Sequence, residues 1–219
     1  MLILFAANML FWALFEQAAA SMTLYADRVL DRNIFGVEMT ASQFGALNAF
    51  FIFLFAPLFA WLWLFLARRG LEPSTPVKFA LGIAQAGLGF GALVIGAATP
   101  NEAGMVLGYW MVLAYLLHTT GELCLSPVGL SAVTKLAVPS VVGVMMGAWF
   151  LATAYSEFVA AQLAQLAAVE TVNGAVLDIN VALASYTQLF SGLLYTGLGV
   201  AALLLLISPL LKKMMHGIH

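Results

Sequence analysis

Six long apolar stretches occupy most of this chain, and they restrict its fold more than any other feature. A helix needs about 20 residues, at 1.5 Å per residue, to cross about 30 Å of hydrocarbon. We expect spans at Leu2–Tyr25, Ser42–Ala67, Val77–Ala98, Met105–Lys135, Val141–Val169 and Leu183–Leu211. The strand-like alternation of a barrel is missing, so the sequence predicts an all-α membrane protein.

The composition excludes a soluble globular domain. Of the 219 residues, 63% are hydrophobic and only 8% are charged, whereas a soluble domain has about 25% charged residues. No basic cluster indicates a nucleic-acid partner. Cys124 is the only cysteine, so an intrachain disulfide is impossible. Motifs for phosphate binding, hydrolysis and metalloproteolysis are missing, and we therefore expect no enzyme, no cofactor and no metal site.

The distribution of basic residues predicts the orientation of the chain. The connections between spans are short and polar, which leaves no room for a separate soluble domain. Two groups of basic residues face each other across the spans: Arg68, Arg69, Lys78, Lys135, Lys212 and Lys213 on one side, Arg28 and Arg32 on the other. Because the richer side is usually cytoplasmic, we expect one bundle, residues 1–219, in the cytoplasmic (inner) membrane with both termini inside.

The order of polar and bland spans repeats after three helices. Spans one and four carry the mid-span glutamates Glu16 and Glu122, whereas spans three and six carry no charge in their interiors. Spans two and five are intermediate, with Asn48 in one and Thr153 in the other. This order is typical of a 3+3 inverted repeat, in which the first helix of each triplet lines the cavity and the third faces lipid.

The two glutamates are the strongest indication of function. An acid at mid-depth costs about 2.5–3.5 kcal/mol on insertion scales, so it usually faces a watered cavity, a partner charge or a substrate. Asn8, Trp12 and Glu16 recur every four residues and share one helix face. A purely structural hydrogen-bonding stripe is the alternative, although amides alone could serve that role.

The fourth span has a comparable face. His118, Glu122, Ser126 and Gly129 lie along it at helical spacing. Pro127 removes a backbone donor, which predicts a kink beside the carboxylate and suits a binding site or a hinge. His118 and Glu122 alone are too few ligands for a metal, so we expect His118 to be a hydrogen-bonding neighbour.

Two further positions have two interpretations each. Asn48 lies mid-span among phenylalanines, where it either joins two helices by a hydrogen bond or contacts a ligand. Trp149 shares a face with Thr153 and Glu157. It either packs in the core or forms the wall of an apolar pocket, and periodicity alone does not choose between them.

Three segments resemble helices of one known family. Residues 11–17, FWALFEQ, followed by Asp27 and Arg28, are similar to the seventh transmembrane helix of the proton-dependent oligopeptide transporters, a branch of the major facilitator superfamily. Residues 121–131, GELCLSPVGLS, resemble the tenth helix, and residues 145–151, MMGAWFL, resemble the eleventh. The resemblance implies that six transmembrane helices form one half of a major facilitator fold.

The resemblance also implies proton-coupled symport of di- and tripeptides. The substrate-binding residues that it implies are Trp12, Asn48, Glu122, Ser126 and Trp149. Glu122 would hold the amino terminus of the peptide, and the two tryptophans would shape the pockets for its side chains. Glu16 would pair with an arginine of the opposite half and release that pair on protonation, which makes it the proton-coupling residue.

Only helices seven to twelve are covered by the resemblance. Alternating access needs two bundles around a central site, so this chain is not expected to transport alone. The implied partners are di- and tripeptides, protons, the lipid bilayer and an N-terminal six-helix half. Hydrophobic sequence also begins at the first residue, without the basic segment of a signal peptide. We therefore expect the chain to be cut from a longer one.

Other functions are compatible with the same pattern. A facilitator for nitrate or a drug-like solute would have the same fold. A non-transporting membrane scaffold would tolerate substitution at Glu16 and Glu122. An intramembrane protease is disfavoured, because the aspartates that its chemistry needs lie only in the connections.

Overall fold

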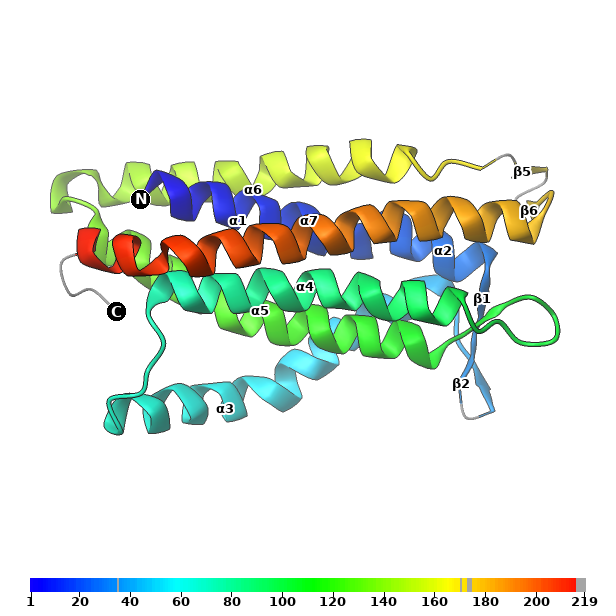
Figure 1. The fold of residues 1–219 in the computed structure, drawn as a ribbon, viewed down its shortest axis with the longest axis horizontal. Coiled ribbons are helices and arrows are strands. Elements are labelled where there is room, and N and C mark those ends of the chain that lie inside the picture. Colours follow the sequence, from blue (N-terminus) through cyan, green and yellow to red (C-terminus); the bar gives the residue numbers. More distant parts are fainter. Residues whose placement is uncertain (35, 170, 173–174, 216–219) are drawn as a thin grey trace.

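The computed structural model describes residues 1–34, 36–169, 171–172 and 175–215, and it is a bundle of long helices (Figure 1). The helices are α1 (Leu2–Phe15), α2 (Ser21–Arg28), α3 (Ala46–Arg68), α4 (Thr75–Ala97), α5 (Tyr109–Leu136), α6 (Val142–Gln165) and α7 (Ile179–Met214). Short 3₁₀ turns lie at Glu16–Ala18, Ala41–Gly45 and Pro139–Val141. The predicted all-α fold is therefore confirmed.

Three small strand pairs lie at one end of the bundle (Figure 1). Strand β1 (Leu30–Asp31) pairs in parallel with β4 (Val106–Leu107), and Leu30 lies opposite Val106. The antiparallel pairs are β2 (Asn33–Ile34) with β3 (Val37–Glu38), and β5 (Thr171–Val172) with β6 (Ala175–Val176). They close the connections between helices at this end and form no extended sheet.

Five of the six expected membrane spans coincide with segments of sufficient length and hydropathy, and the exception is the expected span Met105–Lys135. Five segments of the described chain are long and apolar enough to cross a membrane: Leu2–Arg28, Ala41–Arg68, Thr75–Ala97, Pro139–Gln165 and Ile179–Met214. Helix α5 has 28 residues and is more polar. The last helix begins earlier than expected because Asp178 caps it, accepting a hydrogen bond from the Asn180 N–H at 2.8 Å.

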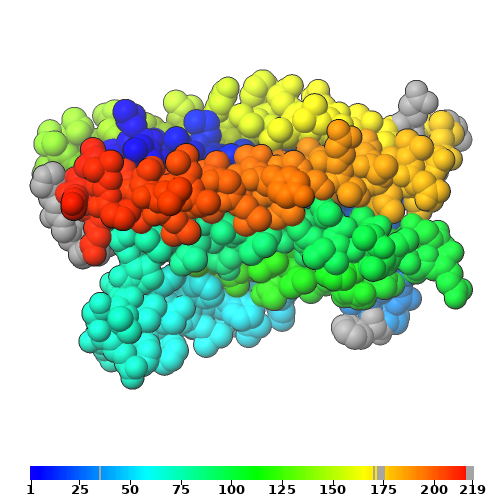
Figure 2. Space-filling view, viewed as in Figure 1, coloured from blue at the N-terminus to red at the C-terminus, as the bar shows by residue number. Residues whose placement is uncertain are grey.

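Helix α4 is the centre of the bundle. Of its most apolar stretch 67% is buried, against 6% for α3 and 11% for α6. It packs most extensively against α5 and α7, and α7 (orange to red) lies along it in Figure 2. The expectation that the third span faces lipid is wrong for α4, because its glycines let two neighbouring backbones approach closely.

Glycines face each other at both of these crossings. A Cβ atom added to Gly82 would lie 2.8 Å from the carbonyl oxygen of Gly121 on α5. A Cβ atom added to Gly197 on α7 would lie 2.9 Å from the Cα atom of Gly87. Both crossings are therefore backbone against backbone, with no space for a side chain.

Helix α3 diverges from the bundle toward its C-terminal end (Figure 1). At that end the Lys78 side chain, only 4% exposed, forms an ion pair with Glu72. The Lys78 ammonium also lies 4.7 Å from the ring centroid of Trp63, a cation–π contact. These contacts tie the end of α3 to the start of α4.

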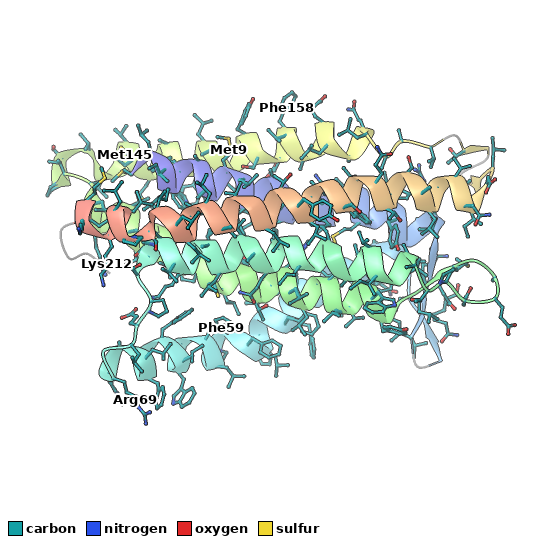
Figure 3. All side chains as sticks on the ribbon, viewed as in Figure 1. Met9, Phe59, Arg69, Met145, Phe158 and Lys212 are labelled. Atoms are coloured by element: carbon teal, nitrogen blue, oxygen red, sulfur yellow. The ribbon has the colours of Figure 1, made fainter. Side chains whose placement is uncertain are left out.

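The basic residues divide between the two ends as the sequence predicts. Arg69 follows α3 and Lys212 lies in the last turn of α7, and both are at the end where α1 begins (Figure 3). Arg28 closes α2 at the opposite end. Which end is cytoplasmic stays a prediction, and the expected cytoplasmic C-terminus, residues 216–219, lies outside the described residues.

The α4–α7 crossing makes a testable prediction. Replacing Gly197 by Val should lower the unfolding free energy in detergent micelles by about 1–3 kcal/mol, because the side chain has no space beside Gly87. Gly199→Val is the matched control on the same helix, since a Cβ atom there meets nothing within 4 Å. Equal stability of the two variants would contradict the close crossing.

Candidate functional site

A polar cluster joins α3 to α5 inside the bundle. The Asn48 side-chain Nδ2 donates to Glu122 Oε2 at 3.0 Å and to Thr119 Oγ1 at 3.2 Å. The Thr119 hydroxyl in turn donates to the Tyr115 carbonyl oxygen at 2.8 Å. Asn48 and Glu122 are half-buried, whereas Thr119 is fully buried. The interhelical hydrogen bond considered for Asn48 is therefore present, and one of its acceptors is the glutamate of α5.

Glu16 lies within electrostatic range of two other carboxylates, of which Glu122 is half-buried and Glu157 is exposed. Glu16 begins the 3₁₀ turn after α1 and is half-buried. Glu122 on α5 and Glu157 on α6 both lie close enough to Glu16 to act on it electrostatically. Among the described residues, Glu16 and Glu122 have no ion pair within 4.0 Å. A region of this kind favours a bound cation, a proton or an ammonium group.

The first span is not the single helix that we expect over Leu2–Tyr25. Helix α1 ends at Phe15, Glu16–Ala18 form a 3₁₀ turn, and α2 begins only at Ser21. Gln17 stabilises the break, because its Nε2 donates to the Ala160 carbonyl oxygen of α6 at 3.0 Å and its Oε1 accepts from Ser21 Oγ at 2.6 Å. Side chains thus bind backbone and polar groups at the break, as the membrane interior requires.

Trp12 and Ser126 occupy positions around the two glutamates. Trp12 is half-buried and packs edge-on against Phe15, with ring centroids 5.2 Å apart. Ser126 follows Glu122 by one helical turn and is also half-buried. Helix α5 continues as one helix through Pro127, so the proline does not end it.

Trp149 packs in the core of the described chain. It is only 3% exposed. Its ring centroid lies 5.3 Å from that of Phe5 on α1 and 6.4 Å from that of Phe79 on α4. A Cβ atom added to Gly129 on α5 would lie 2.6 Å from the Trp149 ring. Of its two interpretations, the core-packing one describes this position.

His118 turns away from the Asn48 cluster. Its Nε2 lies 3.0 Å from the Ala86 carbonyl oxygen on α4, and its ring packs 4.8 Å from Phe90. His118 and Glu122 therefore contact different helices, because α5 lies between α4 and α3. His118 contacts α4, whereas Glu122 contacts α3. Within the part of the chain that the structure describes, no three acidic, histidine or cysteine side chains gather as metal ligands.

Sequence reasoning missed the hydrogen bonds between α1 and α6. Asn8 Nδ2 donates to Thr153 Oγ1 at 3.3 Å, and Ser156 Oγ donates to the Met9 carbonyl oxygen at 2.9 Å. Asn8 is fully buried, so the structural alternative describes this member of the stripe. The polar stripe that begins at Asn8 and the hydroxyl residues of the fifth span were signals for this contact, but the sequence did not show that these two helices are neighbours.

The similarity of this chain to known proteins decides its family. Residues 1–189 match the POT family (PTR2). The chain belongs to this family. The resemblance of three segments to the seventh, tenth and eleventh helices of this family is therefore confirmed, together with the fold of six transmembrane helices.

Curated relatives of this POT-family chain include named transporters. It is 40% identical, over 98% of its length, to the uncharacterized transporter YclF of Bacillus subtilis (strain 168). It is 39% identical, over 72% of its length, to the peptide transporter YePEPT of Yersinia enterocolitica, and 36% identical, over 93%, to dipeptide and tripeptide permease A of Erwinia pyrifoliae. These matches cover 40%, 31% and 40% of the relatives, so the chain spans about two fifths of their length or less.

Solved structures agree with this assignment. The crystal structure of a peptide transporter POT in complex with sulfate matches with a TM-score of 0.83 and 35% identity, over 97% of this chain and 40% of that chain. A POT family transporter in complex with 5-aminolevulinic acid matches with a TM-score of 0.79 and 28% identity, over 94% and 40%. The bundle is thus one part of a larger fold in both structures.

The contact of Asn48 with Glu122 can be measured as a coupling energy. Combining Asn48→Ala with Glu122→Ala should give an unfolding free energy that departs from the sum of the single changes by about 0.5–2 kcal/mol, because one hydrogen bond is lost in all three variants. The control pair combines Thr120→Ala with Glu122→Ala, since the Thr120 hydroxyl donates only to its own helix, at Leu116 and Leu117. If the effects were additive in the Asn48–Glu122 pair as well as in the control pair, the hydrogen bond between Asn48 and Glu122 would be contradicted.

Proposed function

We propose that this chain supplies the C-terminal half of the binding cavity of a proton-coupled symporter for di- and tripeptides. The observation that carries the proposal is the Glu122 carboxylate, which is oriented by Asn48 and lies near Glu16 inside a membrane-spanning bundle. An ammonium group has three donors and no acceptor. In a medium of low dielectric, a carboxylate is the strongest protein partner for such a group.

The residues around Glu122 fit a ligand whose amino terminus is constant and whose side chains vary. Ser126 would add a polar contact one turn further along α5, and Asn48 would contribute its carbonyl oxygen. Trp12 and the phenylalanines beside it would form an apolar wall, which admits many side chains without selecting one. Trp149 would support this wall from behind, since it is enclosed by α1, α4 and α5.

Glu16 is the residue that we propose for proton coupling. Three ionised carboxylates in one region repel one another, so binding a proton or a cation at one of them lowers the energy of the group. The break after Glu16 puts this carboxylate at a point where α1 and α2 meet. Pairing with an arginine of an N-terminal half, released on protonation, would link the proton to movement of the two halves.

A complete carrier would need an N-terminal six-helix half as partner. Alternating access works by rocking of two bundles around a central site, and this chain is one such bundle. We place it in the cytoplasmic membrane, with the end that carries Arg69 and Lys212 inside. The second candidate is a carrier of another small solute, which the similarity to a POT structure in complex with 5-aminolevulinic acid favours. Competition of uptake by a panel of dipeptides distinguishes the two.

Glu122→Gln tests the ligand site. In the complete carrier, this change should lower the affinity for a dipeptide about tenfold to a hundredfold, because it replaces a charge-assisted hydrogen bond of about 1.5–3 kcal/mol. Uptake of a radiolabelled dipeptide into proteoliposomes measures the effect. Glu102→Gln is the control, since Glu102 lies exposed in a turn outside the helices. Near-normal affinity would remove Glu122 from the site.

Glu16→Gln tests the coupling. Accumulation of dipeptide driven by a proton gradient should fall strongly, whereas exchange of labelled for unlabelled dipeptide without a gradient should be retained, because an amide cannot take up and release the proton. Both are measured in the same proteoliposomes, again with Glu102→Gln for comparison. Equal loss of accumulation and exchange would indicate a purely structural role for Glu16.

A further inference from the structure

The amide group of Asn48 is held in one orientation. An amide NH₂ has two hydrogens, and its oxygen has two acceptor positions. Both bonds of the NH₂ group go to α5: one to Glu122 Oε2 at 3.0 Å and one to Thr119 Oγ1 at 3.2 Å. All donor capacity of this side chain is therefore used within the protein.

Two acceptor oxygens remain beside this cluster. Within the described residues, Asn48 Oδ1 and Glu122 Oε1 have no hydrogen-bond partner. Neither is among the enclosed side-chain atoms of the described chain that lack a partner. Neither oxygen is therefore fully enclosed by the packed helices, and a ligand that reaches them would meet acceptors.

Toward the Asn48 amide, the Thr119 hydroxyl oxygen can only accept a hydrogen bond. Its hydroxyl hydrogen is donated to the Tyr115 carbonyl oxygen at 2.8 Å, so its oxygen faces Asn48 with lone pairs. A reversed amide would place Asn48 Oδ1 against this oxygen and leave both without a hydrogen between them. Glu122 disfavours the reversed amide only while it is ionised, since a protonated carboxyl can donate to Oδ1.

We propose that Thr119 is a positioning residue that keeps Asn48 Oδ1 directed at the ligand, whatever the protonation or occupancy of Glu122. The inference rests on the proposed function, and it deepens that proposal by naming the residue that orients the acceptors of the same site. Asn48 Oδ1 and Glu122 Oε1 form a pair of acceptors with no donor between them. Such a pair binds a free ammonium group, with three donors, and disfavours an acylated amine, which has one N–H and an added carbonyl.

The neighbouring threonine provides a matched control. Thr120 is adjacent in sequence and identical in chemistry, but its hydroxyl donates to Leu116 and Leu117 of its own helix at 2.9 and 3.2 Å. Thr119→Val and Thr120→Val remove the same atoms from consecutive positions. Thr119→Ser keeps the acceptor oxygen and should restore the wild-type behaviour.

Selectivity in the complete carrier is the first test. Inhibition constants for dialanine and for N-acetyl-dialanine are measured against uptake of a labelled dipeptide. Thr119→Val should weaken dialanine about tenfold and leave N-acetyl-dialanine unchanged, whereas Thr119→Ser and Thr120→Val should keep the wild-type ratio. An unchanged ratio in Thr119→Val, or an equal loss for both ligands, overturns the inference.

The orientation of the amide is tested without any ligand. In the carrier with ¹⁵N-labelled asparagine, both side-chain hydrogens of Asn48, assigned through Asn48→Gln, should exchange slowly with water. In Thr119→Val one of the two should exchange rapidly, and unchanged protection would overturn the positioning role. Failure of wild-type protein to take up dipeptides would instead overturn the proposed function and the selectivity built on it, while this exchange result still decides the orientation.

Discussion

The direct contact of the α4 backbone with α5 and α7 is the interaction on which the rest of this bundle depends. Lipid tails are as apolar as the side chains, so helices in a membrane associate through close packing and hydrogen bonds. At Gly82 and Gly121, and at Gly87 and Gly197, hydrogen atoms replace side chains and the backbones meet. This contact sets the rotation of α5, and with it the direction in which Glu122 points.

A second set of contacts, made of hydrogen bonds, holds α1 against α6. Asn8, Ser156 and Gln17 each bridge the two helices, and Gln17 does so where the first span breaks. The break leaves backbone groups that cannot be solvated by lipid, so it can exist only where side chains or neighbouring helices bind them. The position of Glu16 therefore depends on the hydrogen bond from Gln17 to α6 as much as on the helix that precedes Glu16.

Length and hydropathy predicted the spans, and the two mid-span glutamates predicted the region where polar groups gather. Sequence could not predict the break after Glu16, because the bond from Gln17 to Ala160 joins residues far apart in the chain. Nor could it distinguish Thr119 from Thr120, since their roles differ only through the rotation of α5 against α3. The enclosure of α4 was missed, and the choice between the two interpretations of Trp149 was left open, for the same reason: composition shows which helices can pack closely, not which one lies between the others.

Helix α3 is fastened near both of its ends and little in between. Asn48 binds α5 near its start, Trp63 lies over Lys78 near its end, and Pro57 interrupts the backbone hydrogen bonds between them. A rod held in this way bows at low elastic cost while its attachments stay intact. The surface that α3 contributes can therefore change its curvature while the hydrogen bond between Asn48 and Glu122 stays intact.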